Sequence, residues 1–177
     1  MSVIVAAANC AVEAATGGAW TIAKTGGAAG VGDASAVSVE AMAGDFVLRA
    51  RLVAPGTAYA GVSVNAAAAH DGASIDRAIQ LSGAIGRVFE TGVQRPPFFG
   101  VSGFVWLRRI GGTLEYGTGP DYAGLSVKRT VSGVTGPLRF DSSLLTQGVA
   151  IEVKFDVPAA FAKAAPRRAR LSFGFSI

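Results

Sequence analysis

The residue types that carry most enzyme chemistry are scarce in this chain, which has one histidine, His70, and one cysteine, Cys10. A serine or cysteine nucleophile usually depends on a histidine base, and a zinc site needs several histidines or cysteines close together. His70 is followed by Asp71 and Gly72, and an Asp-Gly pair is typical of a turn. We therefore interpret His70 as a loop residue rather than a catalytic base, and we expect no metal site.

Paired carboxylates, the other common catalytic arrangement, are not evident either. Glycoside hydrolysis needs two carboxylates held about 5–10 Å apart. Glu152 and Asp156 come nearest to such a pair, but Lys154 lies between them on a run that has the pattern of a solvent face. Glu90 and Glu115 stand alone. The aspartates that a calcium loop would need are isolated from one another: Asp33, Asp71, Asp76, Asp121 and Asp141. The sequence therefore predicts a protein that is not an enzyme and has no cofactor.

The glycine-rich segment at residues 26–33 resembles a phosphate-binding loop only in its glycines. The lysine that would reach the phosphates is absent from the motif, and no strand-then-helix frame surrounds it. We interpret this segment as a flexible loop between strands.

Aromatic residues in loop-like segments are the remaining candidates for recognition. Residues 94–99, with two prolines before Phe98 and Phe99, are predicted to form a stiff loop, and residues 117–122 end in Tyr122. Aromatic faces stack on sugars or pack against a partner, although Phe98 or Phe99 could equally fill the end of the core. The candidate ligand-binding residues are His70, Asp71, Arg95, Phe98, Phe99, Asp121 and Tyr122.

Three runs alternate between apolar and polar residues with a period of two, which is typical of strands with one face on a core. They are residues 45–52, 149–157 and 170–177. Their inward residues predict the following members of the core: Phe46, Leu48, Ile151, Val153 and Phe155.

Weaker strand signals occur at residues 36–41, 59–64, 77–81, 88–91, 104–109, 113–116 and 125–130. Gly111 and Gly112 can both adopt positive φ and predict a tight hairpin. Trp106 alternates with Phe104 and is expected in the core. About ten short strands separated by Gly and Pro turns favour an all-β fold, an antiparallel two-sheet β-sandwich, over a barrel.

Composition fits one folded domain spanning residues 1–177, since 50% of the residues are hydrophobic and 16% are charged. The net charge of +4 is spread along the chain, so we expect no nucleic-acid partner. No apolar stretch approaches the ~20 residues of a membrane helix. The first residues lack a positive segment and Glu13 follows early, so we expect no signal peptide and synthesis in the cytoplasm.

A series of motifs follows one order between residues 20 and 130. A Gly-Asp step at residues 44–45 leads into an extended strand, and a strand with Gly and Ser lies at residues 59–63. A Glu-x-Gly turn at residues 90–92 and a strand–Gly-Gly–strand unit ending in Tyr116 follow. This order resembles the concanavalin A-like (lectin/glucanase) jelly-roll modules of bacteriophage tail, spike and appendage proteins; the C-terminal third does not align.

The resemblance implies a structural or adhesion component of a phage or phage-like particle, in its tail, baseplate or head spike. It also implies a homo-oligomer, with a trimer favoured, that docks on other virion proteins and contacts host surface polysaccharide. Residues 1–15 are nearly uncharged and are expected to pair with or dock on another chain, unless they complete the chain's own sheets. The rival interpretation is a free bacterial carbohydrate-binding module or lectin.

Overall fold

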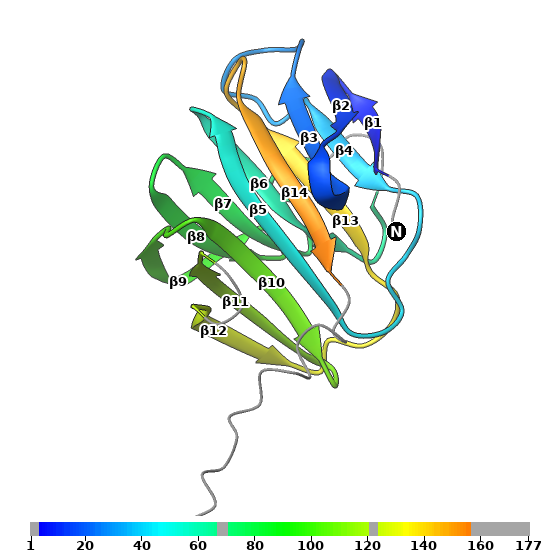
Figure 1. Ribbon diagram of the computed structural model, residues 1–177, viewed down its shortest axis with the longest axis vertical. Coiled ribbons are helices and arrows are strands. Elements are labelled where there is room, and N and C mark those ends of the chain that lie inside the picture. Colours follow the sequence, from blue (N-terminus) through cyan, green and yellow to red (C-terminus); the bar gives the residue numbers. More distant parts are fainter. Residues whose placement is uncertain (1–3, 67–70, 121–123, 157–177) are drawn as a thin grey trace, which may run out of the picture.

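The computed structural model describes residues 4–66, 71–120 and 124–156. Over these residues the chain forms two antiparallel sheets of seven strands each, packed face to face as a sandwich (Figure 1). One short 3₁₀ helix, η1 (Thr16–Gly18), interrupts the strands near the N-terminus. The predicted fold, an all-β antiparallel two-sheet sandwich, is confirmed.

Each sheet combines strands from distant parts of the sequence. In spatial order, sheet A contains β1 (Ile4–Ala8), β4 (Ser35–Ser38), β13 (Arg139–Leu144), β6 (Thr57–Ser63), β7 (Arg77–Ser82), β8 (Ile85–Glu90) and β9 (Val93–Gly100). Sheet B contains β12 (Ser126–Ser132), β11 (Thr113–Gly119), β10 (Phe104–Ile110), β5 (Phe46–Ala54), β14 (Ala150–Asp156), β3 (Ala19–Lys24) and β2 (Cys10–Ala14).

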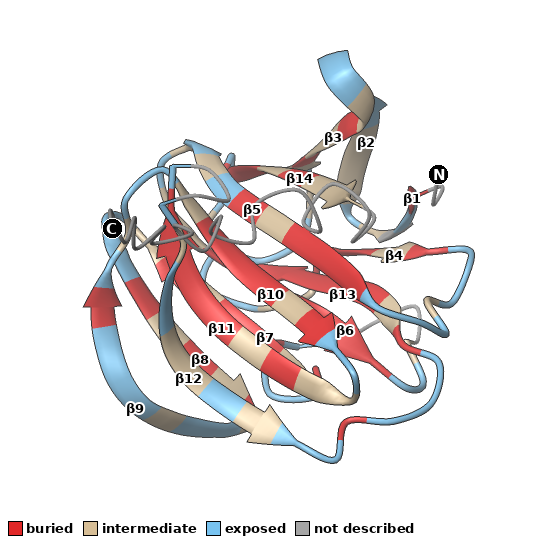
Figure 2. Cartoon of the chain, turned by 60° about the horizontal axis from the view of Figure 1, so that its bottom comes forward, coloured by how far each residue is buried: buried red, intermediate tan, exposed pale blue. Residues whose placement is uncertain are grey.

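The core lies between the sheets and is built from the alternate residues that face inward on each strand. Figure 2 shows the buried segments concentrated in the central strands, while the edge strand β9 is largely exposed. Of the predicted core residues, Phe46, Leu48, Ile151 and Val153 are buried and Phe155 packs against them, half-buried. The largest fully buried core side chains include Tyr116, Phe140, Ile22, Leu48, Ile79, Leu81, Leu107, Leu114, Leu144 and Ile151.

The N-terminal segment forms an edge strand of each sheet. β1 pairs with β4 in sheet A, and β2 pairs with β3 in sheet B. Asn9, with a φ of 48°, makes the crossing between them. Asn and Asp adopt positive φ more readily than most residues, which suits Asn9 to this bend. The described part of the predicted docking segment therefore completes the chain's own sheets, and the outer edges of β1 and β2 are sheet edges.

Two further sequence expectations can be checked directly. The Gly111–Gly112 hairpin is confirmed, because both glycines have positive φ, of 56° and 79°, and Ile110 pairs with Thr113. Trp106 is fully buried as predicted, but it lies on the outer face of sheet B, where its register partner is Arg49. The expected strand at residues 170–177 lies outside the described residues.

Candidate ligand-binding surface

Residues 94–99 belong to edge strand β9, so the predicted loop is wrong. An edge strand has one side without ladder partners and therefore tolerates proline. The Pro96–Pro97 peptide bond is cis, and the β8–β9 register shifts by a bulge at this point. Two prolines in sequence predict a break in pairing, and the bulge accommodates them without ending the strand.

Pleating sends the two adjacent phenylalanines to opposite faces of sheet A. Phe99 is 8% exposed and packs inward against Gly86, where a Cβ atom would lie 2.5 Å from the ring. Phe98 is 61% exposed on the outer face. The sequence left open whether these rings fill the core or lie on the surface. Phe99 fills the core, and Phe98 is the surface ring.

A continuous row of side chains crosses the outer face of sheet A and ends at Phe98. Its members are register partners on four adjacent strands, and we call them the sheet A ladder: Tyr59, Gln80, Arg87 and Phe98. The Gln80 Nε2 donates to the Tyr59 Oη at 2.6 Å, and the Arg87 Nη1 donates to the Gln80 Oε1 at 2.9 Å. The Arg87 Cζ lies 5.8 Å from the centroid of the Phe98 ring. Each link fixes the orientation of the next.

The turn at residues 71–74 covers the other end of the ladder, at Tyr59. The Asp71 Oδ1 accepts from the Ser74 backbone N–H at 2.9 Å, which closes the predicted Asp-Gly turn. Gly72 lies directly on the Tyr59 ring, because a Cβ there would be 2.3 Å from it. Burial raises the pKa of the Tyr59 phenol, and the charge of Asp71 acts in the same direction. Asp71 and Phe98 therefore lie at opposite ends of one surface.

Residues 26–33 are not a free loop, because they wrap around a buried ammonium group. The Lys24 Nζ donates to the backbone carbonyls of Ala28 at 2.7 Å and Val31 at 2.8 Å, and pairs with the Asp33 Oδ1 at 2.6 Å. The hydrogen bond from Lys24 lowers the pKa of Asp33. The loop also supports the Asp71 turn, since a Cβ on Gly32 would lie 3.1 Å from the Asp71 Cα.

Arg95, another predicted ligand residue, belongs to an ionic cluster between the sheets rather than to the ladder. The Arg129 of β12 donates to both oxygens of Glu90 of β8, at 2.8 and 2.9 Å. The Arg95 Nε lies 3.5 Å from the same carboxylate. This cluster ties the β9 edge of sheet A to the β12 edge of sheet B. His70, Asp121 and Tyr122 lie outside the described residues.

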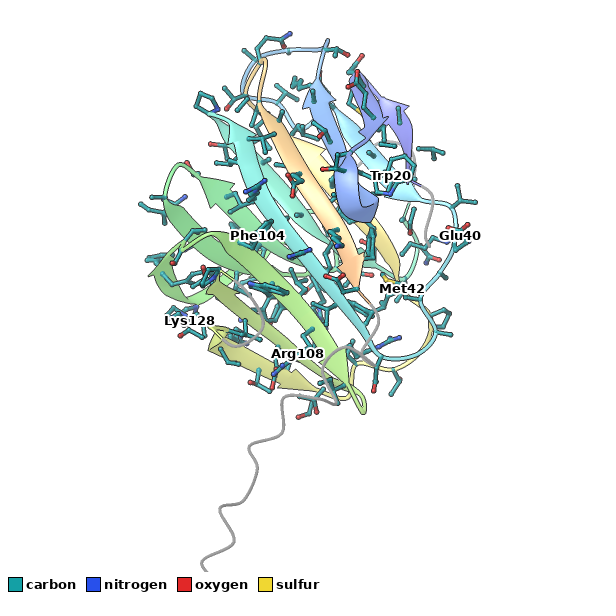
Figure 3. The ribbon with its side chains drawn as sticks, viewed as in Figure 1. Trp20, Glu40, Met42, Phe104, Arg108 and Lys128 are labelled. Atoms are coloured by element: carbon teal, nitrogen blue, oxygen red, sulfur yellow. The ribbon has the colours of Figure 1, made fainter. Side chains whose placement is uncertain are left out.

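The outer face of sheet B carries aromatic and charged residues too. Figure 3 shows Phe104 and Arg108 on β10 of this sheet. The guanidinium carbons of Arg49 and Arg51 lie 5.0 and 4.9 Å from the centroid of the Phe104 ring. Arg108 pairs with Glu115 on the neighbouring strand β11.

The sheet A ladder offers groups that can contact a ligand. It combines an exposed ring with planar polar groups, and Arg87 has five N–H donors of which one is used within the described residues. Among the described residues no three His, Cys, Asp or Glu side chains gather as a metal site. No helix in the described part of the chain is long and apolar enough to cross a membrane.

The sequence missed three of the four ladder residues. Tyr59, Gln80 and Arg87 are separated by up to 28 positions, and only the strand register places them in one row. The sequence offered one signal, the polar residue Gln80 between the apolar residues Ile79 and Leu81.

No protein-family model and no curated protein matches the chain. Solved structures do resemble it. The SPRY domain of human HERC1 superposes with a TM-score of 0.55 and 11% identity, over 83% of this chain and 93% of that one. A functionally unknown protein from Saccharomyces cerevisiae gives a TM-score of 0.55 at 9% identity, over 89% of this chain and 96% of that one.

These likenesses show the fold alone, a β-sandwich like that of a SPRY domain, and nothing about function. A weaker likeness is to the CBM2 module of the evolved Dit protein of Lactobacillus casei BL23 phage J-1. It has a TM-score of 0.38 at 12% identity, over 69% of this chain and 66% of that one, and shows nothing about this chain.

Proposed function

We propose that this protein is a structural and adhesion component of a phage or phage-like particle. It serves in the tail, baseplate or head spike and contacts the surface polysaccharide of the host through the sheet A ladder. The order of motifs between residues 20 and 130 supports membership of a particle. A concanavalin A-like sandwich is compatible with this role and equally with that of a free bacterial lectin.

The observation that carries polysaccharide contact is the exposed ring of Phe98 beside the fixed guanidinium of Arg87. A sugar presents apolar C–H groups that pack on an aromatic face and hydroxyl groups that need donors and acceptors. The hydrogen bonds from Arg87 to Gln80 and from Gln80 to Tyr59 hold these groups in place before a ligand arrives. Such preorganisation reduces the entropy lost on binding.

Calorimetric titration with purified capsular polysaccharide and O-chains of the host tests polysaccharide contact. Phe98→Ala should weaken binding at least tenfold. Val93→Ala is the matched control, because Val93 is exposed on the same strand but is not in the ladder. Equal affinities of wild type and Phe98→Ala would contradict polysaccharide contact at this site.

Particle membership is tested separately, by mass spectrometry of purified particles produced by the strain that encodes the chain. The proposal expects the protein at a fixed stoichiometry in the particles. Polysaccharide binding by a protein that is absent from the particles would favour the free lectin instead.

We also propose that the protein forms a homo-oligomer, with a trimer favoured. The oligomer is supported by the sheet edges on both sides of the sandwich: β1 and β2 lie at one side, and β9 and β12 at the other. Sedimentation equilibrium at micromolar concentration should give the mass of three chains. A monomer at that concentration would contradict the trimer and leave docking on a different virion protein to be tested with the particle.

A further inference from the structure

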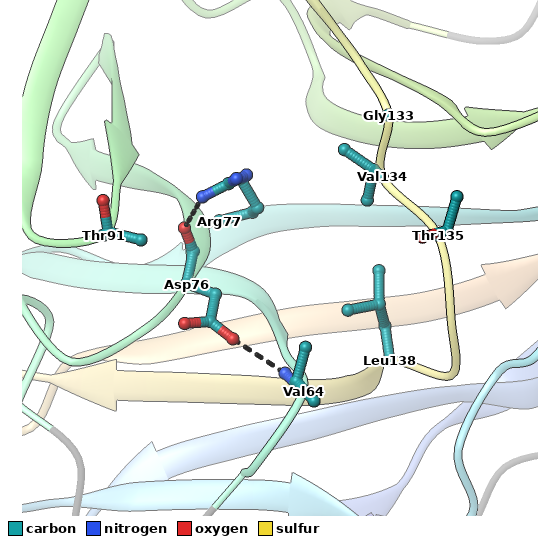
Figure 4. A pocket seen from close by; sticks show the side chains of 8 residues that line it. All are labelled: Val64, Asp76, Arg77, Thr91, Gly133, Val134, Thr135 and Leu138. Atoms are coloured by element: carbon teal, nitrogen blue, oxygen red, sulfur yellow. Dashed lines mark hydrogen bonds between the residues drawn. The ribbon is translucent and has the colours of Figure 1, made fainter.

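A hollow of about 270 Å³ lies at one end of the sandwich, between the start of β7 and the segment that joins β12 to β13 (Figure 4). One wall is polar and consists of Asp76, Arg77 and Thr91. The facing wall is apolar and includes Val134 and Leu138. Arg77 alternates with the core residues Ile79 and Leu81, so the hollow is on the inner side of sheet A and the ladder on the outer side.

Arg77 lines this hollow, and its Nη2 has no hydrogen-bond partner among the described residues. Its Nη1 donates to the backbone carbonyl of Asp76 at 2.8 Å. Its Nε is buried and has no hydrogen-bond partner in the described structure. A buried donor that lacks a partner is costly. A guanidinium N–H donates a strong, charge-assisted hydrogen bond to a carboxylate oxygen.

The neighbouring acids are already occupied. Glu90, the register partner of Arg77, accepts both hydrogen bonds from Arg129, and these bonds lower its pKa. The Asp76 Oδ2 accepts from the backbone N–H of Val64 at 2.8 Å. Neither acid forms an ion pair with Arg77 among the described residues, and Glu90 acts on its charge only at longer range.

The phenol of Tyr116 does not compensate this charge either. Tyr116 is fully buried near Arg77 and Arg129, and its Oη has no hydrogen-bond partner in the described structure. Burial raises the pKa of this phenol, so it remains neutral. Among the described residues, three guanidinium groups, of Arg77, Arg95 and Arg129, therefore lie beside two carboxylates, of Glu90 and Asp76, which leaves one positive charge in excess at this end of the sandwich.

We propose that this hollow binds one carboxylate-bearing sugar, a uronate, with its carboxylate on the Nη2 of Arg77. The volume matches a single sugar ring, and Val134 and Leu138 offer an apolar wall for the C–H face of the ring. The choice of a sugar over another carboxylate rests on the proposed function. An acidic polysaccharide would then use this end of the sandwich in addition to the ladder.

Titration calorimetry with methyl glucuronoside, methyl glucoside and N-acetylaspartate tests the site. The glucuronoside should bind, and the neutral glucoside and the amino-acid carboxylate should each bind at least tenfold more weakly. Equal affinity for the glucoside would contradict a role of the carboxylate. Equal affinity for N-acetylaspartate would contradict the assignment to a sugar.

Two variants locate the binding at the hollow. Arg77→Met removes the guanidinium and should weaken glucuronoside binding at least tenfold. Val64→Trp should do the same by bulk, because Val64 is 56% exposed at the rim and its replacement leaves the core intact even if Arg77→Met unfolds. Val53→Trp, at an exposed position of sheet B, is the matched control. Unchanged binding by Val64→Trp would place the ligand elsewhere.

Phe98→Ala separates this inference from the proposed function. It should weaken polysaccharide binding at least tenfold and leave glucuronoside binding unchanged, since Phe98 lies on the outer face. If wild type binds the glucuronoside but no polysaccharide, the proposed function fails and the uronate site stands. If polysaccharide binds and the glucuronoside does not, the uronate site fails alone.

Discussion

The outer face of each sheet carries arginines beside an aromatic ring, but the arginines of the two sheets differ in their hydrogen-bond and ion-pair partners. On sheet B, Arg49 and Arg51 lie over the Phe104 ring, and each is also paired with an acid: Arg49 with Asp156 at 3.3 Å and Arg51 with Glu152 at 2.7 Å. On sheet A, Arg87 bonds to the neutral Gln80 and has no acidic partner among the described residues, and Phe98 is 61% exposed.

The difference indicates which face is available to a ligand. The arginines of sheet B have their charge balanced within the chain, and two guanidinium groups already cover its aromatic ring. The sheet A ladder retains donors that have no partner within the described part of the chain and a ring that is 61% exposed, and internal hydrogen bonds fix its geometry. We therefore assign recognition to sheet A and interpret the polar face of sheet B as stabilised by its own pairs.

The largest expected effect separates the two sides of strand β9. Phe99→Ala should reduce the free energy of unfolding by about 3–5 kcal/mol, because the ring is buried against Gly86. Phe98→Ala should change it by less than about 0.5 kcal/mol, as expected for an exposed residue. Urea denaturation of both variants measures this. Similar losses for the two would mean that Phe98 is also part of the packing.

Lys24→Met tests the support of the Asp71 end of the ladder. The Lys24 side chain is buried, and its replacement leaves the carbonyls of Ala28 and Val31 without their donor. We expect a loss of about 3 kcal/mol in the free energy of unfolding. Hydrogen exchange should accelerate in residues 26–33 and in the Asp71 turn. Unchanged exchange there would show that the loop is held by other contacts.

Glu90→Gln tests the ionic cluster that joins the edges of the two sheets, with an expected loss of about 2 kcal/mol at pH 7. The hydrogen bonds from Arg129 hold the pKa of Glu90 below its ordinary value of 4.5, and burial opposes them. The carboxylate therefore stabilises the folded state fully above that pH, and this contribution is lost as the pH falls through the lowered folded-state pKa.

Urea denaturation of wild type and Glu90→Gln from pH 7 down to pH 3 isolates this contribution. The difference in stability between the two proteins should shrink as the pH falls below 4.5. A constant difference would show that the charge of Glu90 does not contribute to the stability that the cluster provides.

The smallest effect is expected on the outer face of sheet B. Arg51→Gln removes an exposed ion pair with Glu152 and should cost less than about 1 kcal/mol, a loss that decreases further in high salt. Thermal unfolding at low and high salt measures it. A salt-independent loss above about 2 kcal/mol would mean that this face is more than a solvated surface.

The sequence predicted the strands in which one face is polar and the other apolar, such as β5 and β14, because their period of two is visible in one dimension. It missed β13, in which Asp141, Ser142 and Ser143 are all buried. The inward Ser142 Oγ donates to the Ala36 carbonyl, and the Ser63 Oγ donates to the outward Asp141. When polar residues occupy both faces of a strand, the alternation disappears from the sequence.

For the site, the sequence identified the types of residue but not their neighbours. The sequence identified Phe98 as a candidate surface ring and Asp71 as a turn residue, and the two lie at opposite ends of the ladder. Arg95 and Phe99 were grouped with them by proximity in the sequence, although pleating and the ionic cluster separate them in space. The register that joins Tyr59 to Gln80 and Arg87 depends on long-range pairing that one sequence does not display.

The most direct test of the account compares one substitution on the two outer faces. Affinity for the host polysaccharide is measured by titration calorimetry for wild type, Arg87→Gln on sheet A and Arg51→Gln on sheet B, after circular dichroism has shown that all three are folded. We predict at least a tenfold loss of affinity for Arg87→Gln and no change for Arg51→Gln. A loss confined to Arg51→Gln, or equal affinity in all three proteins, would contradict the assignment of recognition to sheet A.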